Sequence, residues 1–395
     1  MPLPSVSVVI PTYQRRELVR KAVSSALAQT FQSFELIVVD DGSTDGTESA
    51  VAGLDERIRY VWQENRGVSA ARNAGIRLAC GAIVAFLDSD DRWLPEHLAV
   101  VTEVLARHPE AILCTTTPRF EIGGRQSVSD AEVVDALPSL FVENMVGCPS
   151  SVAIRREPLL STNGFDERLF VMEGWELWLR LALLGRFALL ERQTIVVQAT
   201  QGSLTERSTR SGEYVRALET MAPIVVDLAG RVAQREDHAR LRARAAGLSA
   251  YLEALGALAR DDRELARTTL AAACTGLPEL SLEPQLVANR LSLLRFGPRA
   301  RLQSFGSAAA LWPDPRADTA LYLRFHALVL ALRLGRGAEA ARLLFDWPLS
   351  ATPQFVVRRA SVFARLMRRA LQRRLYRGGE SRAMPTTVGA DSAKR

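Results

Sequence analysis

The stretch 81–93 joins a strand-length apolar run to a cluster of carboxylates. Residues 81–87 are apolar throughout, and Asp-Ser-Asp-Asp follows at 88–91. An apolar run of this length that ends in turn residues indicates a strand buried on both faces of a sheet. The chain therefore leaves the core abruptly here and delivers three carboxylates to one short turn.

Carboxylates that are crowded into one turn repel one another and resist joint ionisation unless a cation holds them. Hard divalent ions such as Mg²⁺ and Mn²⁺ take oxygen ligands, and they typically bind one or two carboxylates plus the phosphates of a substrate. The turn at 88–91 is therefore a candidate site for a metal-bound diphosphate. The alternative is an acidic turn that only caps the helix expected to start near Pro95.

The first ninety residues alternate strand patterns with helical patterns. Strands are predicted at 6–10, 35–39, 57–62 and 81–87, and helices at 17–29 and 69–78. This alternation predicts a doubly wound, mostly parallel α/β sheet with right-handed crossovers. Ligands bind such sheets at the carboxyl ends of the strands. Three polar loops fall at that edge, at 11–13, 40–45 and 88–91.

The chemistry of these loops fits a nucleoside diphosphate. The carboxylate of Asp41 can accept a ring N–H from a base, and Tyr13 can pack beside that base. Residues 65–73 place arginines at a helix start, where backbone N–H groups and the helix dipole favour anions. The alternative for residues 40–45 is an ordinary strand-to-helix turn with Asx and Ser/Thr caps.

Two other nucleotide-binding designs are disfavoured. No Gly-x-Gly-x-x-Gly follows the first strand, and Pro11 stands where that glycine turn would begin. The phosphate-loop lysine is missing as well, because the only lysines are Lys21 and Lys394. The sequence therefore argues against a dinucleotide-binding dehydrogenase and against a P-loop enzyme.

Four ordered motifs carry a resemblance to a known family. They lie at 10–13 (Ile-Pro-Thr-Tyr), 38–47, 65–75 and 86–93. Together they resemble the family 2 glycosyltransferases of the GT-A fold, and the similarity covers residues 4–205. The resemblance implies an inverting transferase with a nucleotide-sugar donor, a UDP-sugar being favoured, and a divalent cation, Mn²⁺ or Mg²⁺. The acceptor would be a glycan or a lipid-linked glycan of the cell surface.

The resemblance also implies roles for individual residues. Those that would hold the nucleotide are Pro11, Thr12, Tyr13, Asp41, Arg72 and Asp88, the last near the ribose. Asp90 and Asp91 would lie at the metal and the diphosphate. These assignments are expectations carried over from the family pattern.

The chain departs from that pattern at the general base. An inverting transfer needs a group that takes the proton of the acceptor hydroxyl as its oxygen attacks the anomeric carbon. In the family this group is usually the Asp of a Glu-Asp pair that follows an Asn-Gly-Phe-Asp-Glu stretch. Here the stretch is present at 163–167, but the pair reads Glu173-Gly174. The histidine that commonly precedes Gly-Ser-Leu-Thr is also missing, because Gln201 stands there.

Two interpretations of the missing base remain open. In the first, Glu173 or Glu176 supplies it, since residues three apart share one face of a helix. In the second, the protein is a catalytically impaired nucleotide-sugar-binding or scaffold protein. Glu173 would then only support the neighbouring helix.

Past Thr205 the composition shifts to Ala, Leu and Arg with helical spacing. We predict a GT-A domain at 1–207, an all-α domain at 208–377 and a disordered tail at 378–395. Residues 354–377 form a basic amphipathic pattern. It predicts either a peripheral contact with an anionic membrane surface or the last helix of a bundle with a solvated arginine face.

Cysteine usage and charge bear on location and partners. The four cysteines form no close pair, and Cys80 and Cys114 sit in apolar runs, which predicts buried free thiols and a cytoplasmic protein. Any peripheral contact would be at the inner membrane face. No apolar run reaches the roughly 18 residues of a membrane span. The net charge of +6 is carried by arginine, and no motif that reads nucleic acid is present.

Overall fold

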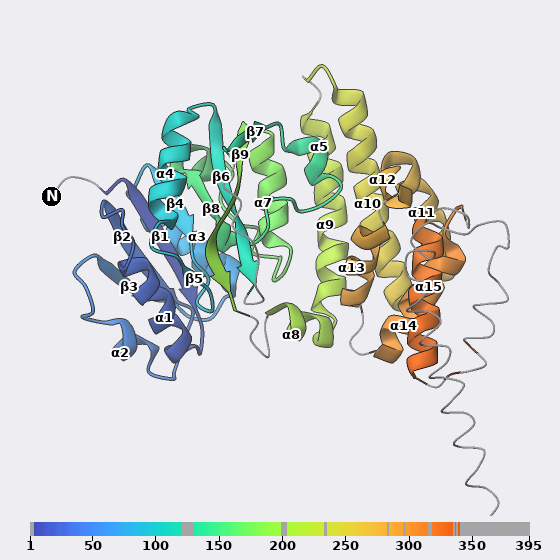
Figure 1. The fold of residues 1–395 in the computed structure, drawn as a ribbon, viewed down its shortest axis with the longest axis horizontal. Helices are drawn as coiled ribbons and strands as arrows, with labels where there is room; N and C mark the ends of the chain where they lie inside the picture. Colours follow the sequence, from blue (N-terminus) through green and yellow to red (C-terminus); the bar gives the residue numbers. More distant parts are fainter. Residues whose placement is uncertain are drawn as a thin grey trace, which may run out of the picture. The chain divides into compact units, whose positions relative to one another are not determined.

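The computed structural model describes residues 4–120, 130–198, 204–232, 235–282, 284–294, 298–314 and 318–334, together with Arg336 and Glu339. The chain divides into two compact units, and Figure 1 shows their elements. The first unit contains the residues up to Leu280 together with 293–295, and the second contains 281–292 and the residues from 296 onward. The candidate site lies entirely in the first unit.

The first unit is built on one sheet with the strand order β3-β2-β1-β4-β8-β6-β9-β5. The strands are β1 (Val6–Thr12), β2 (Phe34–Asp40), β3 (Ile58–Trp62), β4 (Ile83–Phe86), β5 (Arg92–Trp93), β6 (Ala111–Phe120), β7 (Glu132–Val134), β8 (Val152–Arg155) and β9 (Arg186–Val197). Strands β1 to β4 pair in parallel. Strand β8 runs antiparallel between β4 and β6, and β5 and β7 pair antiparallel with β9. The predicted α/β fold is confirmed, with parallel strands at the predicted places and a mixed second half.

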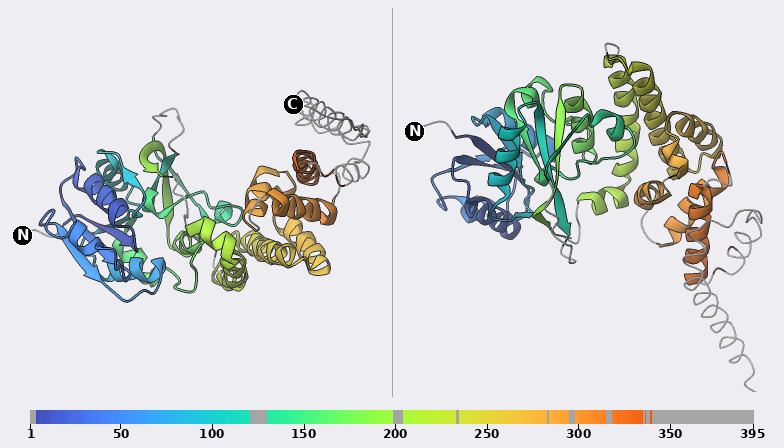
Figure 2. Two further views of the ribbon diagram at one scale, coloured as in Figure 1. Left: turned by 90° about the horizontal axis from the view of Figure 1, so that it is seen from below. Right: turned by 45° about the horizontal axis from the view of Figure 1, so that its top comes forward.

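Helices cover both faces of this sheet (Figure 2). The helices between its strands are α1 (Arg16–Leu27), α2 (Thr47–Val51), α3 (Val68–Leu78), α4 (His97–Arg107), α5 (Leu137–Leu140), α6 (Arg156–Ser161) and α7 (Glu173–Ala182). Alternate residues of β1 serve the two layers, as the period of a strand requires. Val8 belongs to the core formed with α1 and α4. Val9 lies under α3, so close to Gly75 that a Cβ at that position would collide with its methyl groups.

Helices follow the last strand, as the composition predicts. The first unit continues with α8 (Leu204–Ser211), α9 (Glu213–Arg231), α10 (His238–Arg260), α11 (Arg263–Gly276) and the start of α12 (Glu279–Leu282). Arg244 in α10 donates to the carbonyl of Pro138 at 2.9 Å, and Arg235 pairs with Asp135. These contacts attach the helices to the sheet region. A separate domain that begins at residue 208 therefore stays a prediction.

The second unit contains most of α13 (Pro284–Leu294), α14 (Pro298–Leu311) and α15 (Asp318–Arg333). The predicted amphipathic helix at 354–377 and the predicted tail at 378–395 lie outside the described residues. The membrane contact predicted for that helix stays a prediction.

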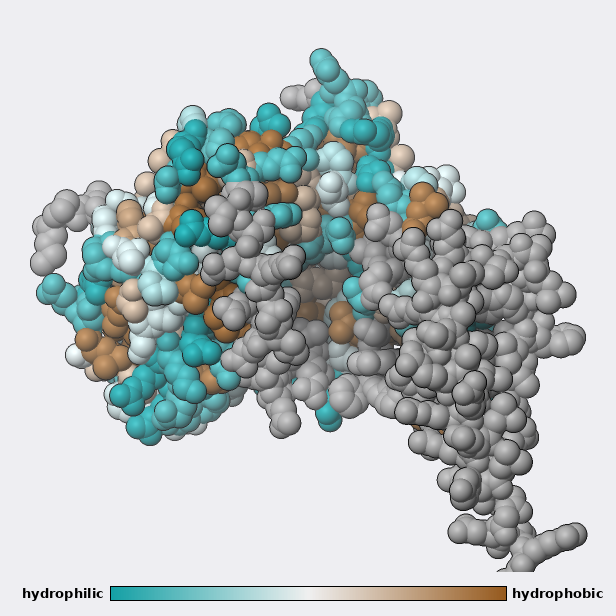
Figure 3. Space-filling model, viewed as in Figure 1, coloured by the Kyte–Doolittle hydropathy of each residue, from teal (hydrophilic) through white to brown (hydrophobic). Residues whose placement is uncertain are grey.

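The described part of the chain contains no helix that is both long and apolar enough to span a bilayer. On the face seen in Figure 3, hydrophobic side chains of the first unit lie scattered among hydrophilic ones. Burial of the thiols is confirmed for Cys114 and wrong for Cys80, which is exposed. Cys80 lies in the turn between α3 and β4, so the apolar run that follows it does not cover its side chain.

Candidate functional site

Two loops at the carboxyl edge of the parallel strands are joined by polar contacts. Gln14, after β1, adopts a left-handed φ of 51°, which costs a non-glycine residue on the order of 1–3 kcal/mol. Its N–H donates to Ser43 Oγ at 2.8 Å, and its side-chain amide donates to Thr44 Oγ1 at 3.0 Å. The N–H of Arg16 donates to Asp45 Oδ2 at 2.9 Å. The loops after β1 and β2 therefore hold each other in place.

The two neighbours of this junction, Thr12 and Tyr13, differ in exposure. The side chain of Thr12 is buried, and its hydroxyl has no hydrogen-bond partner among the described residues. A buried hydroxyl without a partner is unfavourable, so this group is suited to bind a ligand. Tyr13 is 43% exposed beside it. The structure thus places both predicted residues at the edge where a ligand would bind.

Asp41 is buried and already accepts three hydrogen bonds. Its Oδ1 accepts from Gln63 Nε2 at 2.7 Å and from the N–H of Arg66 at 3.0 Å, and its Oδ2 accepts from the N–H of Gly67 at 2.8 Å. The carboxylate therefore fixes the loop that leads into α3. Since an ionised carboxylate has about four acceptor positions, contact with a base remains compatible with this geometry and stays a prediction.

Arg72 on α3 is the centre of the predicted site. Its guanidinium is only 3% exposed, and it donates to Asp88 Oδ1 at 2.6 Å and to Glu173 Oε1 at 2.8 Å. Burial alone would lower the pKa of Arg72, but the charges of Asp88 and Glu173 outweigh burial and raise it. Arg72 therefore stays charged and joins the acidic turn to the start of α7.

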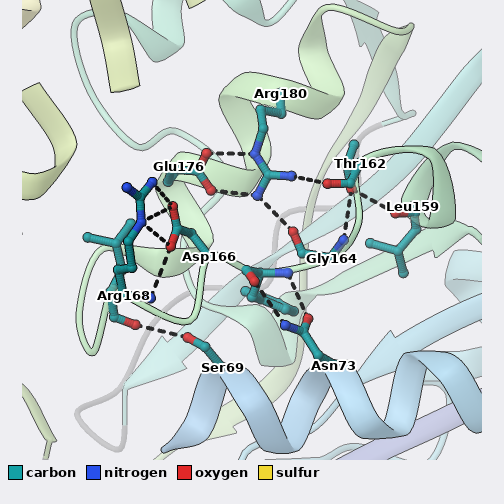
Figure 4. A network of polar contacts seen from close by, with 11 residues as sticks. Ser69, Asn73, Leu159, Thr162, Gly164, Asp166, Arg168, Glu176 and Arg180 are labelled. Atoms are coloured by element: carbon teal, nitrogen blue, oxygen red, sulfur yellow. Dashed lines mark hydrogen bonds and ion pairs between the residues drawn. The ribbon is translucent and has the colours of Figure 1, made fainter. Parts of the chain in front are cut away.

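The Asn-Gly-Phe-Asp-Glu stretch braces α3 against α7 (Figure 4). Asn73 exchanges two hydrogen bonds with the backbone of Phe165, at 2.8 and 2.9 Å. Arg180 donates to the carbonyls of Thr162 and Gly164 at 2.6 and 2.7 Å. This network holds the polypeptide that precedes α7 and so fixes the position at which Glu173 begins the helix.

The two candidate bases lie in different environments. Glu176 is 1% exposed, and both of its carboxylate oxygens accept from Arg180 at 2.6 Å. Its geometry therefore argues for a supporting role. Glu173 accepts from Arg72 through Oε1 only, so its other oxygen is not occupied by that pair. The structure brings Glu173, and not Glu176, to the group that contains Asp88.

The acidic turn is organised by Ser150, a residue that no sequence motif indicated. Its Oγ accepts from the N–H of Asp88 at 3.0 Å and donates to Asp91 Oδ2 at 2.6 Å. Asp91 is 5% exposed, and burial together with the charges of Asp88 and Asp90 raises its pKa to about 7. Asp90 pairs instead with Arg15, whose NH1 lies 2.5 Å from Oδ2.

The carboxylates of this turn fit a divalent cation that takes part of its ligands from the protein and the rest from a nucleotide. Among the described residues there is no group of three or more His, Cys, Asp or Glu side chains that could hold a metal by itself. Asp88 and Asp90 are 23% and 18% exposed, whereas Asp91 turns inward to Ser150. Two accessible carboxylates suit Mg²⁺ or Mn²⁺ when diphosphate and water complete the coordination.

Known proteins resemble both the sequence and the fold. Residues 7–159 match the family model described as "Glycosyl transferase family 2". An uncharacterized glycosyltransferase of Rickettsia conorii is 30% identical over 206 residues, which are 51% of this chain and 34% of that protein. TuaG of Bacillus subtilis, a glycosyltransferase assigned to teichuronic acid biosynthesis, is 44% identical over 99 residues, 24% of this chain and 39% of TuaG.

The structural comparison extends further along the chain. The crystal structure of S. aureus TarS 1–349 superposes with a TM-score of 0.54 at 18% identity, and it covers 80% of this chain and 94% of TarS 1–349. At this identity the likeness establishes the fold. The chain spans about a third of the length of the curated relatives that it matches.

Proposed function

We propose that the protein, whose residues 7–159 match the model of glycosyl transferase family 2, transfers a sugar from a nucleotide-sugar donor to a glycan or lipid-linked acceptor with inversion at the anomeric carbon. The observation that carries the proposal is the position of Arg72, whose charge is shared between the acidic turn and α7. This arrangement brings a candidate diphosphate site and a candidate base into one group of contacts.

A UDP-sugar is the favoured donor, and a surface polysaccharide is the favoured acceptor. TarS 1–349 has been crystallised with UDP-GlcNAc and with UDP, and that chain shares the fold. TuaG is assigned to teichuronic acid biosynthesis. The hydroxyl of Thr12, which has no partner in the described part of the chain, and the carboxylate of Asp41 offer a polar lining for the nucleoside.

The predicted metal ligands are Asp90 and Asp91, but Asp91 turns inward to Ser150. In the present proposal a divalent cation would be held by Asp90 and by Asp88, the residue predicted to lie near the ribose, with Asp91 behind them. When bound, the cation neutralises charge on the diphosphate leaving group. Arg72 orients Asp88, and Ser150 fixes the backbone of the turn through the N–H of the same residue. The chain thereby holds the accessible carboxylates in place before any ligand binds.

Glu173 is the proposed general base. Arg72 holds one of its oxygens, and the other is the atom that would take the proton of the acceptor hydroxyl. The rival proposal is a protein that binds nucleotide-sugar without transferring it. Two observations favour the rival: Glu176 is fully paired with Arg180, and Gly174 has no side chain at the family's usual base position.

The test is a screen of UDP-, GDP- and dTDP-sugars with Mn²⁺ that measures both binding and nucleotide release. Binding with release supports the transferase, and binding without release supports the rival. If none of the donors binds, both proposals are wrong.

The role of Glu173 is tested by Glu173→Gln, which keeps an oxygen for Arg72 but removes the base. We expect nucleotide release to fall by about 10²–10⁴-fold while UDP affinity is retained. Glu157→Gln on α6 is the matched control, because Glu157 is exposed and lies outside the group. Equal rates in the two variants would exclude Glu173 as the base.

A further inference from the structure

Arg15 forms an ion pair with a carboxylate of the acidic turn. Its NH1 lies 2.5 Å from Asp90 Oδ2, and the two side chains are 21% and 18% exposed. The pair therefore lies at a surface that solvent reaches, in contrast to the buried contact of Arg72 with Glu173. Residues 15 and 90 lie far apart in the sequence, and no motif indicated this contact.

The backbone around Arg15 is fixed, so only its side chain has freedom to move. The N–H of Gln14 and the N–H of Arg16 are each held by the loop after β2. The carbonyl of Arg15 accepts from the N–H of Val19 at 2.9 Å and begins α1. The guanidinium therefore lies at the end of a long side chain whose backbone is anchored beside the turn.

Each carboxylate of the turn has a partner of a different kind. Asp88 is paired with the buried Arg72, and Asp91 accepts from Ser150. Neither partner is accessible enough to exchange readily with solvent ions, since Arg72 is 3% exposed and Ser150 is fully buried. At Asp90 the guanidinium belongs to a partly exposed side chain, and a divalent cation that binds Asp90 Oδ2 must displace it.

We propose that Arg15 is a diphosphate-binding residue that exchanges partners. In the nucleotide-free protein it pairs with Asp90, and when a cation and a nucleoside diphosphate bind, the cation replaces it on Asp90 and its guanidinium moves to the phosphates. This proposal rests on the proposed function, since it assumes that a nucleoside diphosphate binds at the turn. The planar fork of donors on arginine matches phosphate oxygens. Charge stays compensated in the exchange, because the cation would take the place of the guanidinium at Asp90 and the guanidinium would pair with a phosphate.

The exchange couples the two ligands. The cation alone must break the pair of Arg15 with Asp90 and leaves a guanidinium next to a dication, which is unfavourable. The cation together with the diphosphate gives that guanidinium a new anionic partner. Cation and nucleotide should therefore bind more tightly together than either binds alone.

The test uses the full chain with Arg15→Gln and measures two affinities by calorimetry: Mn²⁺ alone, and UDP or GDP at saturating Mn²⁺. We expect Mn²⁺ alone to bind about two- to fivefold more tightly in the variant, because a competitor has been removed. We expect the nucleotide to bind about tenfold more weakly, because a charged donor to phosphate has been lost.

Two further variants sharpen the result. Arg16→Gln is the matched control, since the side chain of Arg16 is 52% exposed and its ion pair within the described part of the chain is a 3.9 Å contact with Glu17. Both affinities should equal those of the wild type. Arg15→Lys keeps the charge without the fork, and we expect its nucleotide affinity to fall between wild type and Arg15→Gln.

Opposite changes in the two affinities support the exchange. Unchanged affinities overturn it, and so does a loss of both, which would mean that Arg15 only supports the turn. A wild-type protein that binds neither UDP nor GDP with Mn²⁺ contradicts the proposed function itself, and the exchange with it. A wild-type protein that binds nucleotide while Arg15→Gln behaves identically contradicts the exchange alone.

Discussion

Replacement of Arg72 by Met tests whether this arginine holds the acidic turn and α7 together. The substitution keeps a long side chain and removes the guanidinium that donates to Asp88 at 2.6 Å and to Glu173 at 2.8 Å. Arg72 and Glu173 have side chains that are 3% and 10% exposed, whereas that of Asp88 is 23% exposed and partly solvated. In the variant, the buried carboxylate of Glu173 is therefore destabilised more than the partly solvated carboxylate of Asp88.

The magnitude follows from the burial of the pair. Removal of one partner of a buried ion pair costs about 3–5 kcal/mol, because the other charge is left without compensation. Glu173→Gln in the same chain removes that charge, so the double variant should be more stable than the sum of the single changes predicts. For groups in direct contact this coupling is about 0.5–3 kcal/mol.

The assay is urea unfolding at pH 7 for the wild type, both single variants and the double variant. Arg77→Met is the matched control, because Arg77 lies exposed on the same helix and should change stability by less than about 0.5 kcal/mol. A loss below about 1 kcal/mol in Arg72→Met, or strict additivity in the double variant, would refute the reasoning.

Three further predictions concern neighbouring positions. Burial lowers the pKa of His97 to about 3. Below pH 6.5 the unfolded chain therefore binds one proton more than the folded protein, and the free energy of unfolding should fall by about 1.4 kcal/mol per pH unit toward pH 3. Urea unfolding at pH 7 and 4.5 measures this fall, and an equal pH dependence in His97→Gln would contradict it. Gly75→Ala would press a methyl group against Val9 and should lower the stability of the fold by about 1–3 kcal/mol in thermal unfolding. An unchanged Tm would show that the space between α3 and β1 accommodates the methyl group. Gly174→Asp introduces the residue that family 2 glycosyltransferases usually carry as the base. An added Cβ would lie 3.3 Å from the indole nitrogen of Trp178, which has no partner in the described residues. Nucleotide release from the donor should rise in that variant, and an equal rate would argue against position 174 as the site of the base.

The elements of the sheet could be predicted because their signals are local. Runs rich in β-branched residues predict strands at 6–10 and 35–39. The observed strands β1 (Val6–Thr12) and β2 (Phe34–Asp40) lie within two residues of these limits. The polar loops then had to meet at one edge, since parallel strands place their carboxyl ends together. The pairing of Glu176 with Arg180 also had a local signal, because residues four apart on a helix are neighbours.

The contacts that organise the acidic turn had no such signal. Ser150 lies 59 residues from Asp91, and only the position of β8 next to β4 brings it there. Arg15, which pairs with Asp90, follows Gln14, whose left-handed conformation could not be predicted from its residue type. The exposure of Cys80 follows equally from the tertiary structure, since an apolar sequence neighbourhood does not say where a strand begins.

The most direct test of the central claim is the affinity of UDP for the wild-type protein and for Asp90→Asn, each measured by calorimetry with Mn²⁺ and with EDTA. Asp90→Asn keeps the shape of the side chain and removes the charge that would hold the cation at an accessible position of the turn. We predict that Mn²⁺ strengthens UDP binding to the wild type and that most of this gain is lost in Asp90→Asn. Equal UDP affinity in Mn²⁺ and EDTA, or an undiminished gain in the variant, would contradict a metal-assisted nucleotide site at residues 88–91.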